Sequence, residues 1–416
     1  MFILNRMINL APLKSNVSQL RSDLKKVKGT LALITSLPGF FRDRIAIEQA
    51  QEEIKRALDS REQRFLELAR TEIYQRPTSP YLRLLKLAGC EFSDLQLHVH
   101  SHGLEKTLEY LAKEGVYLTS DEFKGKKEVV RGGDCFRVSP GDFERLDPHP
   151  GFATQSSGTK DKPVLSHTSL DWVAIRALAA GIFFSAHNLF SYSHALYDAM
   201  LPGSGFVHLF FFAKFGKESD RWFAREIPVE TWLEGKYHYL ATYLMVLTGK
   251  WFGPGFLKPE LIDIPEIHRI VRWIEAKRRE GKSCLITTVA SSAARIARVA
   301  SEMGISLERT KFNVAGEPLT QAKEETIKRV GASITSRYSY GGAITVGFGC
   351  ANPLFGDEIH INQDMLALIR HPRPLATPHR FNPFFAPHCI LQLLGCSSMS
   401  KMGTMRHWIE ETVVVL

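Results

Sequence analysis

A short hydroxyl-rich stretch near the middle of the chain has the residue types that bind an anion. Ser156, Ser157, Gly158 and Thr159 stand together, and Lys162 follows three residues later. A turn of such small residues can present backbone N–H groups and hydroxyls to a single negatively charged group, and a lysine adds a compact positive charge. These residues predict a loop that holds a polyphosphate. A solvated surface turn of the same composition is the alternative.

The flanking sequence predicts how this loop is placed. Pro163 has a fixed φ and leads into a short apolar strand at Val164 and Leu165, and Thr168 can then cap a helix. The apolar residues of that helix recur at helical spacing, namely Trp172, Ile175, Leu178, Ala179 and Ile182. The loop is not a Walker A, because the chain contains no G-x-x-x-x-G-K-[ST] run.

The most regular periodicity lies beyond residue 264 and predicts alternating helices and strands. The expected helices are 265–281, a helix capped by Ser291 or Ser292, and 320–330, and the expected strands are 284–289, 311–315 and 332–338. Strands that alternate with helices through short turns imply parallel pairing with right-handed crossovers. Ligands of such sheets bind beyond the carboxyl ends of the strands.

Two segments fall at the expected carboxyl ends of neighbouring strands. The first is N-V-A-G-E-P-L-T, in which Gly316 allows close backbone approach, Glu317 accepts hydrogen bonds and Pro318 stiffens the turn. The second is S-R-Y-S-Y-G-G-A-I-T, in which Tyr338 or Tyr340 offers an aromatic face for stacking. A tight turn with a glutamate near a helix N-terminus would also explain the first segment.

In their order along the chain, these three segments resemble motifs of the adenylate-forming (AMP-forming) ligases, in particular of proteins similar to phenylacetate-CoA ligase. The first resembles the family's phosphate loop, T-S-G-T-T-G-K-P, the second its turn G-G/A-E-P-L/W-T, and the third its motif Y-G-x-[ST]-E. The stretch S-P-Y-L-R-L-L-K-L-A-G at 79–89 is similar to the entry segment of the same proteins. The resemblance covers about residues 80–370.

The resemblance implies both a fold and a reaction. The fold is α/β, the large domain of an adenylate-forming ligase with parallel-rich sheets flanked by helices. In the implied reaction, a small carboxylic acid reacts with Mg·ATP to form an acyl-adenylate, and pyrophosphate is released. The acyl group is then transferred to CoA or another thiol carrier. The expected organisation is a helical N-terminal segment at 1–80, the large domain at 81–370, and a truncated or aberrant C-terminal small domain at 371–416.

The resemblance also implies roles for individual residues. Thr159 and Lys162 would act in catalysis, where donors and a cation meet the charge that grows on the leaving pyrophosphate. The implied nucleotide-binding residues are Ser156, Ser157, Gly158, Gly316, Glu317, Pro318 and Tyr338. The implied acid pocket lies in an aromatic-rich stretch and contains His187, Asn188, Tyr192 and His194. An aromatic core with hydrogen-bonded histidines would explain this last group equally well.

Two departures from the family's pattern support a second interpretation. The glutamate of the third motif, which helps to hold Mg²⁺ in the family, is replaced by Gly342 if Tyr338 is the matching tyrosine and by Ile344 if Tyr340 is. Beyond Arg370, the family's ribose-binding aspartate, hinge and catalytic lysine have no counterpart. The alternative function is therefore a degenerate, catalytically impaired nucleotide-binding protein of the same fold.

The composition of the whole chain argues against several other classes. Its 53 lysines and arginines exceed its 44 aspartates and glutamates, which gives a net charge of +9, but they form no large cluster, so no nucleic-acid partner is expected. The apolar runs contain Arg176 and His208 and predict buried core rather than a membrane span, and a secretion signal is not expected. Six cysteines without a C-x-x-C pair fit the reducing cytoplasm. A homodimer stays an open alternative.

Three closely spaced histidines raise the question of a metal. His98, His100 and His102 alternate with other residues, and in a strand this spacing would place them on one side. The neighbouring cysteine and carboxylates stand at no recognised ligand spacing, and a polar edge strand or loop explains the histidines more simply. No metal site is expected there.

Overall fold

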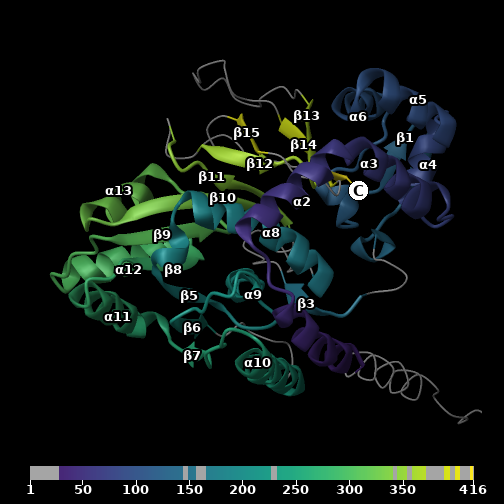
Figure 1. Cartoon of the computed structure of the whole chain (residues 1–416). Helices are drawn as coiled ribbons and strands as arrows, with labels where there is room; N and C mark the ends of the chain where they lie inside the picture. The colour runs from purple at the N-terminus through teal and green to yellow at the C-terminus, as the bar shows by residue number, and fades with distance from the viewer. Residues whose placement is uncertain are drawn as a thin grey trace, which may run out of the picture.

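A sheet of nine strands forms the centre of the molecule (Figure 1). The computed structural model describes residues 28–143, 149–155, 165–225, 232–340, 344–353, 358–371, 388–393, 399–402 and 413–415. From one edge to the other, the strand order is β15-β12-β11-β10-β9-β8-β5-β6-β7. The strands are β5 (Ser193–Ala199), β6 (Arg221–Arg225), β7 (Glu260–Leu261), β8 (Cys284–Val289), β9 (Thr310–Ala315), β10 (Ser333–Tyr340), β11 (Ile344–Gly349), β12 (Ile359–Asn362) and β15 (Met399–Met402).

Parallel pairing joins the strands from β10 to β7, whereas β11, β12 and β15 add antiparallel strands at one side. The predicted strand 284–289 is confirmed, and those predicted at 311–315 and 332–338 are present as β9 and β10. Their parallel pairing is confirmed as well. The chain is an α/β protein, as the alternation of helical and strand periodicity predicts.

Helices cover both faces of this sheet. On one face lie α11 (His268–Arg279), α12 (Ala290–Glu302) and α13 (Gln321–Arg329), which pack on alternate residues of the strands such as Ile286 and Phe312 (Figure 1). A 3₁₀ turn, η4 (Ile264–Ile267), precedes α11. The helix predicted at 265–281 is therefore confirmed, and its predicted inner residues are all buried, namely Ile267, Ile270, Val271 and Ile274.

The opposite face is covered by α8 (Leu170–Ala186) and α9 (Val207–Lys214), which build an aromatic core. Its deeply buried rings include Phe41, Phe183, Phe184, Phe206, Phe210, Phe211, Phe212 and Phe348. The 3₁₀ turn η3 (Leu189–Ser191) links α8 to β5, and α10 (Trp232–Phe252) follows β6. The apolar runs are thus core, as predicted, and none of the helices in the described part of the chain is long and apolar enough to cross a membrane.

The N-terminal part is helical where it is described. After a helix at 28–42, its elements are α2 (Ile47–Asp59), α3 (Arg61–Ala69), the π-helix η1 (Arg70–Tyr74), α4 (Pro80–Leu87), α5 (Phe92–His102), α6 (Leu104–Lys113), α7 (Ser120–Phe123), β1 (Val129–Arg131), β2 (Asp134–Phe136) and η2 (Pro140–Phe143). One apolar cluster runs from α3 to β1 and includes Ala367 and Ile369 of β13 (Leu366–His371). The predicted boundary after residue 80 falls inside this cluster.

The strand considered for the three histidines is wrong, because they lie on helix α5. A capping box starts this helix, in which the Asp94 side chain accepts a hydrogen bond from Glu91 N at 2.9 Å. On a helix, His98 and His102 share one face, with ring centroids 5.7 Å apart, and His98 stacks on Tyr110 at 4.9 Å. Within the described residues, no three potential metal ligands come together.

The C-terminal stretch contributes strands to two sheets. β13, β14 (His388–Leu393) and β16 (Val413–Val415) form a three-stranded sheet, and β15 pairs with β12 at the edge of the central sheet. The sequence pattern beyond residue 370 did not indicate these strands. The interpretation of 371–416 as a truncated or aberrant small domain stays a prediction.

A buried lysine docks the N-terminal helix against the core. The Lys214 side chain is 1% exposed, and its Nζ donates to Phe40 O at 3.2 Å and to Asp43 Oδ2 at 2.8 Å. In the reverse direction, Ile45 N donates to Lys214 O at 2.8 Å. The ammonium also lies 4.6 Å from the centre of the Phe40 ring. A buried ammonium needs such partners, because desolvating it alone is costly.

We expect Lys214→Met to lower the free energy of unfolding by about 1–3 kcal/mol, because it removes hydrogen bonds that a buried charge makes to Phe40 and Asp43. Lys217→Met, which changes an exposed lysine of the next turn, is the matched control and should change it by less than about 0.5 kcal/mol. Urea titration followed by circular dichroism measures both. Equal effects of the two substitutions would show that Lys214 does not hold the N-terminal helix.

Candidate functional site

The turn after β9 brings the Gly316 backbone close to a side chain at the end of β8. Gly316 has a φ of +81°, and a Cβ at this position would lie 3.3 Å from Val289 Cγ1. Side chains rarely adopt this conformation, and the neighbouring strand end leaves little room for one. A glycine is therefore required where the chain leaves β9 and passes the end of β8.

The Glu317 carboxylate ties two neighbouring turns together. Its Oε1 accepts a hydrogen bond from Ser291 N at 2.8 Å, and its Oε2 accepts one from Lys323 Nζ at 2.9 Å. The prediction that Ser291 or Ser292 caps helix α12 is wrong, because Val289 is the N-cap residue and has no capping side chain. Instead, the Glu317 carboxylate accepts the hydrogen bond from Ser291 N in the first turn of α12. Its negative charge is favourable at the positive end of the helix dipole.

Two opposing effects set the charge state of Glu317. Burial raises the pKa of its carboxyl group, but the hydrogen bonds from Lys323 and Ser291 outweigh burial, so that the pKa lies below the usual glutamate value. The group is therefore ionised at neutral pH. An ionised Glu317 can accept hydrogen bonds but cannot donate one.

Tyr338 lies on the strand next to this turn. In the parallel register Ser336 pairs with Val314, which places Tyr338 level with Gly316 on the adjacent strand. The ring is half-buried and packs against an apolar cluster that contains Ile344, Val346, Ile359, Ile361, Met365 and Leu366. A register shift between Tyr338 and Ser339 then bends the end of β10. The structure thus brings Gly316, Glu317 and Tyr338 together at the carboxyl ends of β9 and β10.

The predicted phosphate loop connects the two strands of a hairpin. β3 (Gly151–Gln155) pairs antiparallel with β4 (Leu165–Ser169), and Gln155 faces Leu165. The loop residues between them lie outside the described residues, namely Ser156, Ser157, Gly158, Thr159 and Lys162. Their roles stay predictions, and the described part of the hairpin fixes only where the loop begins and ends.

The base of this hairpin lies near Tyr338. Ser169 at the end of β4 caps α8 by accepting a hydrogen bond from Trp172 N at 3.2 Å. The predicted cap, Thr168, is one residue early, and its hydroxyl shares a hydrogen bond with Thr154 at 3.1 Å. Trp172 packs against the same apolar cluster as Tyr338. Of the predicted inner residues of α8, Leu178 and Ala179 are buried but Ile175 is 36% exposed.

The residues predicted for the acid pocket lie toward the other end of the parallel strands. His187 ends α8, and Asn188 and Tyr192 precede β5, so all three lie at the amino end of that strand. His187 Nε2 is 3.0 Å from Gly349 O, and Asn188 is exposed with a φ of +53°. The structure does not bring these three residues to the edge that carries Gly316 and Tyr338.

His194, the fourth of these residues, is part of the interior. It is fully buried, its ring stacks on Phe212 at 4.1 Å, and its nitrogens lie 2.7 Å from Ser219 Oγ and 3.0 Å from Thr287 Oγ1. Burial, and to a lesser extent the charge of Arg337, lower the pKa of His194 to about 3, so the ring is neutral. This is the hydrogen-bonded core histidine of the alternative interpretation.

Sequence reasoning missed a polar pair at the carboxyl end of β5. Asp198 Oδ1 accepts hydrogen bonds from Ala199 N at 2.7 Å and from Arg225 Nη2 at 3.4 Å. Gly205 lies against this carboxylate, since a Cβ there would be 2.1 Å from Asp198 Cγ. The signal available in the sequence was an aspartate at the end of an apolar strand.

The described carboxylates at this edge do not fit a magnesium site. Asp198 is paired with Arg225, and Glu317 is paired with Lys323. Magnesium requires free oxygen ligands in an octahedral arrangement, and both groups are already held by cations. In the described part of the chain, this edge therefore provides no ligand set for the ion.

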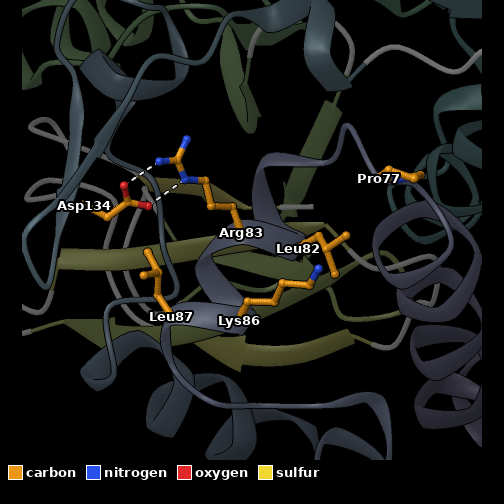
Figure 2. A pocket seen from close by; sticks show the side chains of 6 residues that line it. All are labelled: Pro77, Leu82, Arg83, Lys86, Leu87 and Asp134. Atoms are coloured by element: carbon orange, nitrogen blue, oxygen red, sulfur yellow. Dashed lines mark hydrogen bonds and ion pairs between the residues drawn. The ribbon is translucent and has the colours of Figure 1, made fainter.

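A shallow pocket elsewhere in the molecule does not belong to this site. It lies over α4 and is lined by Pro77, Leu82, Arg83, Lys86, Leu87 and Asp134 (Figure 2). Figure 2 shows the Arg83 guanidinium turned toward Asp134, with which it forms an ion pair. This pairing occupies the one arginine of the pocket with the protein's own carboxylate.

Comparison with known proteins gives low similarities. No family model and no curated protein matches the chain. Among solved structures, 2-hydroxyisobutyryl-CoA ligase in the postadenylation state has 13% identity and a TM-score of 0.41, over 82% of this chain and 61% of that one. An acyl-CoA synthetase (AMP-forming)/AMP-acid ligase II-like protein from Dyadobacter fermentans has 12% identity and a TM-score of 0.31, over 64% and 59%.

ATP-bound MatB from Rhodopseudomonas palustris has 13% identity and a TM-score of 0.27, over 48% of this chain and 31% of that one. The chain thus spans less than two thirds of the length of each of these three proteins. Similarities this low leave the function to be argued from the residues of the chain itself.

We expect Glu317→Ala to lower the free energy of unfolding by about 1–2 kcal/mol at neutral pH, because α12 loses the acceptor for its free N–H group. The pKa of Glu317 is lower in the folded chain than in the unfolded one, so this contribution is complete above the ordinary glutamate pKa and is lost as the pH falls through the folded-state value. The difference between wild type and variant should therefore shrink on acidification. Urea titrations between about pH 7 and pH 3 measure it.

Glu302→Ala is the control for this substitution, because Glu302 is exposed in the last turn of the same helix. A negative charge is unfavourable at that end, so its removal should leave the stability unchanged or slightly raised. A Glu317→Ala effect that does not vary with pH would mean that the carboxylate charge has no part in capping α12.

Proposed function

We propose that this chain activates a small carboxylic acid with ATP as an acyl-adenylate and transfers the acyl group to a thiol, with CoA as the proposed acceptor. The observation that carries the proposal is the arrangement at one edge of the sheet. There the Gly316–Pro318 turn follows β9, and Tyr338 lies on the neighbouring strand β10. Trp172, at the base of the loop-bearing hairpin, packs against the same apolar cluster as Tyr338. These are the segments that resemble adenylate-forming ligases of the phenylacetate-CoA ligase type.

In the first step, a carboxylate oxygen of the acid attacks the α-phosphorus of ATP, and the bond from that phosphorus to the bridging oxygen breaks. Pyrophosphate leaves with the electron pair. The hydroxyls and N–H groups of Ser156, Ser157 and Thr159, with Lys162, would stabilise the charge on this leaving group. Adenine would lie between the Gly316 backbone and the Tyr338 ring, because glycine permits close approach and tyrosine permits stacking.

In the second step, a thiolate attacks the acyl carbon, and AMP leaves with the electrons of the broken acyl–phosphate bond. Neither step is routed through a metal ion, because the described residues at this edge do not provide its ligands. His187, Asn188 and Tyr192 would contribute to an acid pocket only if that pocket reached the amino end of β5. The region beneath α8 and α9 is a second place for the acid.

A nucleotide-binding protein without the ligase activity is the second candidate function. The specific observation that favours it is the pairing of Asp198 and Glu317 with Arg225 and Lys323. A triphosphate with its magnesium would find no free carboxylate from these two residues to anchor the ion. The chain would then bind ATP without turning it over.

Exchange of labelled pyrophosphate into ATP, measured with a panel of aryl and fatty acids, tests the proposal. We expect exchange that requires an acid, and we expect Lys162→Ala to lower it about a hundredfold, because a charge that stabilises the leaving group is lost. Lys282→Ala, an exposed lysine beyond α11, is the control and should leave the rate unchanged. ATP binding without exchange for any acid in the panel would favour the second candidate instead.

A further inference from the structure

Two arginines are buried between the sheet and the helices α8 and α9. Arg176 on α8 is 3% exposed and Arg337 on β10 is 6% exposed. Neither forms an ion pair within the described ranges, although the charge of Asp198, which is paired with Arg225, acts on Arg337. Arginine is rarely buried unless it is paired, because removing a guanidinium from water is costly. These two side chains therefore need an explanation beyond core packing.

The register of the sheet places Arg337 just before the carboxyl ends of β9 and β10, where Gly316 and Tyr338 lie. Because Ser336 pairs with Val314, Arg337 lies beside Ala315, one residue before Gly316. Arg176 approaches from the helix above, where its Nη2 donates to Thr345 Oγ1 of β11 at 3.2 Å. Asp198 lies on the same face at the end of β5, but it is paired with Arg225. The arginines are thus adjacent to the proposed acid and nucleotide site.

Several polar atoms in this region lack a partner. They are Nε and Nη1 of Arg176, Nε of Arg337, Nδ1 of His208, and both side-chain amide atoms of Asn313. His208 on α9 is 4% exposed, and Asn313 on β9 is fully buried. Buried polar groups are normally hydrogen-bonded, so this concentration of unpartnered polar atoms, most of them donors, is unusual for a core. A bound group that accepts hydrogen bonds would satisfy them.

The charges of these groups act on one another. Burial lowers the pKa of Arg176 to about 9, with the charge of Arg337 as the second cause. Burial lowers the pKa of Arg337 to about 10, and the charge of Asp198 opposes this shift in part. Both therefore stay protonated at neutral pH. The pKa of His208 lies well below its usual value because of burial and then of the two arginines, so its ring is neutral. Two like charges with neutral donors around them favour an anion.

We propose that Arg176, Arg337 and His208 form a binding site for a carboxylate of the acid substrate other than the one that is activated, so that the preferred substrate is a dicarboxylic acid. This inference rests on the proposed function. The guanidinium groups match the planar carboxylate, and His208 and Asn313 add neutral hydrogen-bonding groups.

The surroundings favour an organic acid over a free phosphate. The Arg176 guanidinium carbon lies 5.3 Å from the centre of the Phe211 ring, and the His208 ring meets the same phenylalanine edge to face at 5.1 Å. Phe210 and Phe183 belong to the same core cluster. Aromatic walls with a few converging polar groups are typical of sites for organic ligands. The carbon frame of a diacid would pack on these rings while its distal carboxylate meets the arginines.

Isothermal titration calorimetry of the full chain tests the site directly. Phthalate and succinate are compared with benzoate and butyrate, and with inorganic phosphate, all as sodium salts at equal ionic strength. We expect each dicarboxylate to bind at least tenfold more tightly than its matched monocarboxylate. Equal affinity for both classes would overturn the proposal, and tighter binding of inorganic phosphate than of any diacid would assign the site to a phosphate instead.

Substitutions of the arginines test whether they cause the preference for dicarboxylates. Arg176→Met and Arg337→Met should each remove the tenfold preference, Arg337→Lys should keep part of it, and Arg298→Met, at an arginine that is 68% exposed, should leave it intact. Circular dichroism and the melting temperature without ligand show whether each variant is folded. If an arginine variant does not fold, the remaining arginine variant and the lysine variant still test the site. Retention of the preference in every folded arginine variant would overturn the proposal.

Pyrophosphate exchange separates this inference from the function on which it rests. Exchange with monocarboxylic acids and no preference for diacids would reject the dicarboxylate site and leave the ligase function standing. A diacid preference that depends on the arginines, without exchange for any acid, would reject the ligase function and leave an anion-binding site.

Discussion

Parallel hydrogen bonding between β8, β9 and β10 is the constraint on which the rest of the structure depends. It aligns the carboxyl ends of three strands, so that the residues following each strand meet at one edge. A single side chain links the turns at these strand ends, because Glu317 in the turn after β9 accepts a hydrogen bond from Ser291 N in the turn after β8. Gly316 has a φ of +81°, and a Cβ there would lie 3.3 Å from Val289 Cγ1, so a side chain at this position would be strained.

Several charged or titratable side chains are buried in or beside the aromatic core, and they differ in whether the chain itself provides partners for them. Lys214 is matched by Asp43 and by main-chain carbonyls, and His194 stays neutral between two hydroxyls. Both solutions satisfy a polar group within the chain. Arg176 and Arg337 form no ion pair among the described residues, and Nε and Nη1 of Arg176 and Nε of Arg337 have no hydrogen-bond partner there. The difference separates side chains that hold the fold together from side chains that are available to a ligand.

The sequence predicts the secondary structure correctly where the periodicity of apolar residues is strong. The strands and helices between 264 and 340 follow from a simple alternation of periods, and so do their parallel pairing and the placement of Gly316, Glu317 and Tyr338 at one edge. Short polar stretches are harder. The histidines of α5 fit a period of two, but a capping box at Glu91 and Asp94 starts a helix there.

Long-range partners could not be predicted from the sequence. The group that caps α12 comes from Glu317, 26 residues away from Ser291, whereas cap signals in a sequence are local. The two arginines are 161 positions apart by their numbers, and only the fold shows that both are buried without an ion pair among the described residues. An arginine within an apolar run, such as Arg176, was the one available signal.

In the proposed function, the loop of the β3–β4 hairpin and the turn after β9 bind one nucleotide together. Hydrogen–deuterium exchange of the full chain, with and without a non-hydrolysable ATP analogue, tests this most directly. We expect slower exchange of backbone amides in both 151–169 and 313–320 when the analogue is bound. Protection of only one of these segments, or of neither, would contradict it.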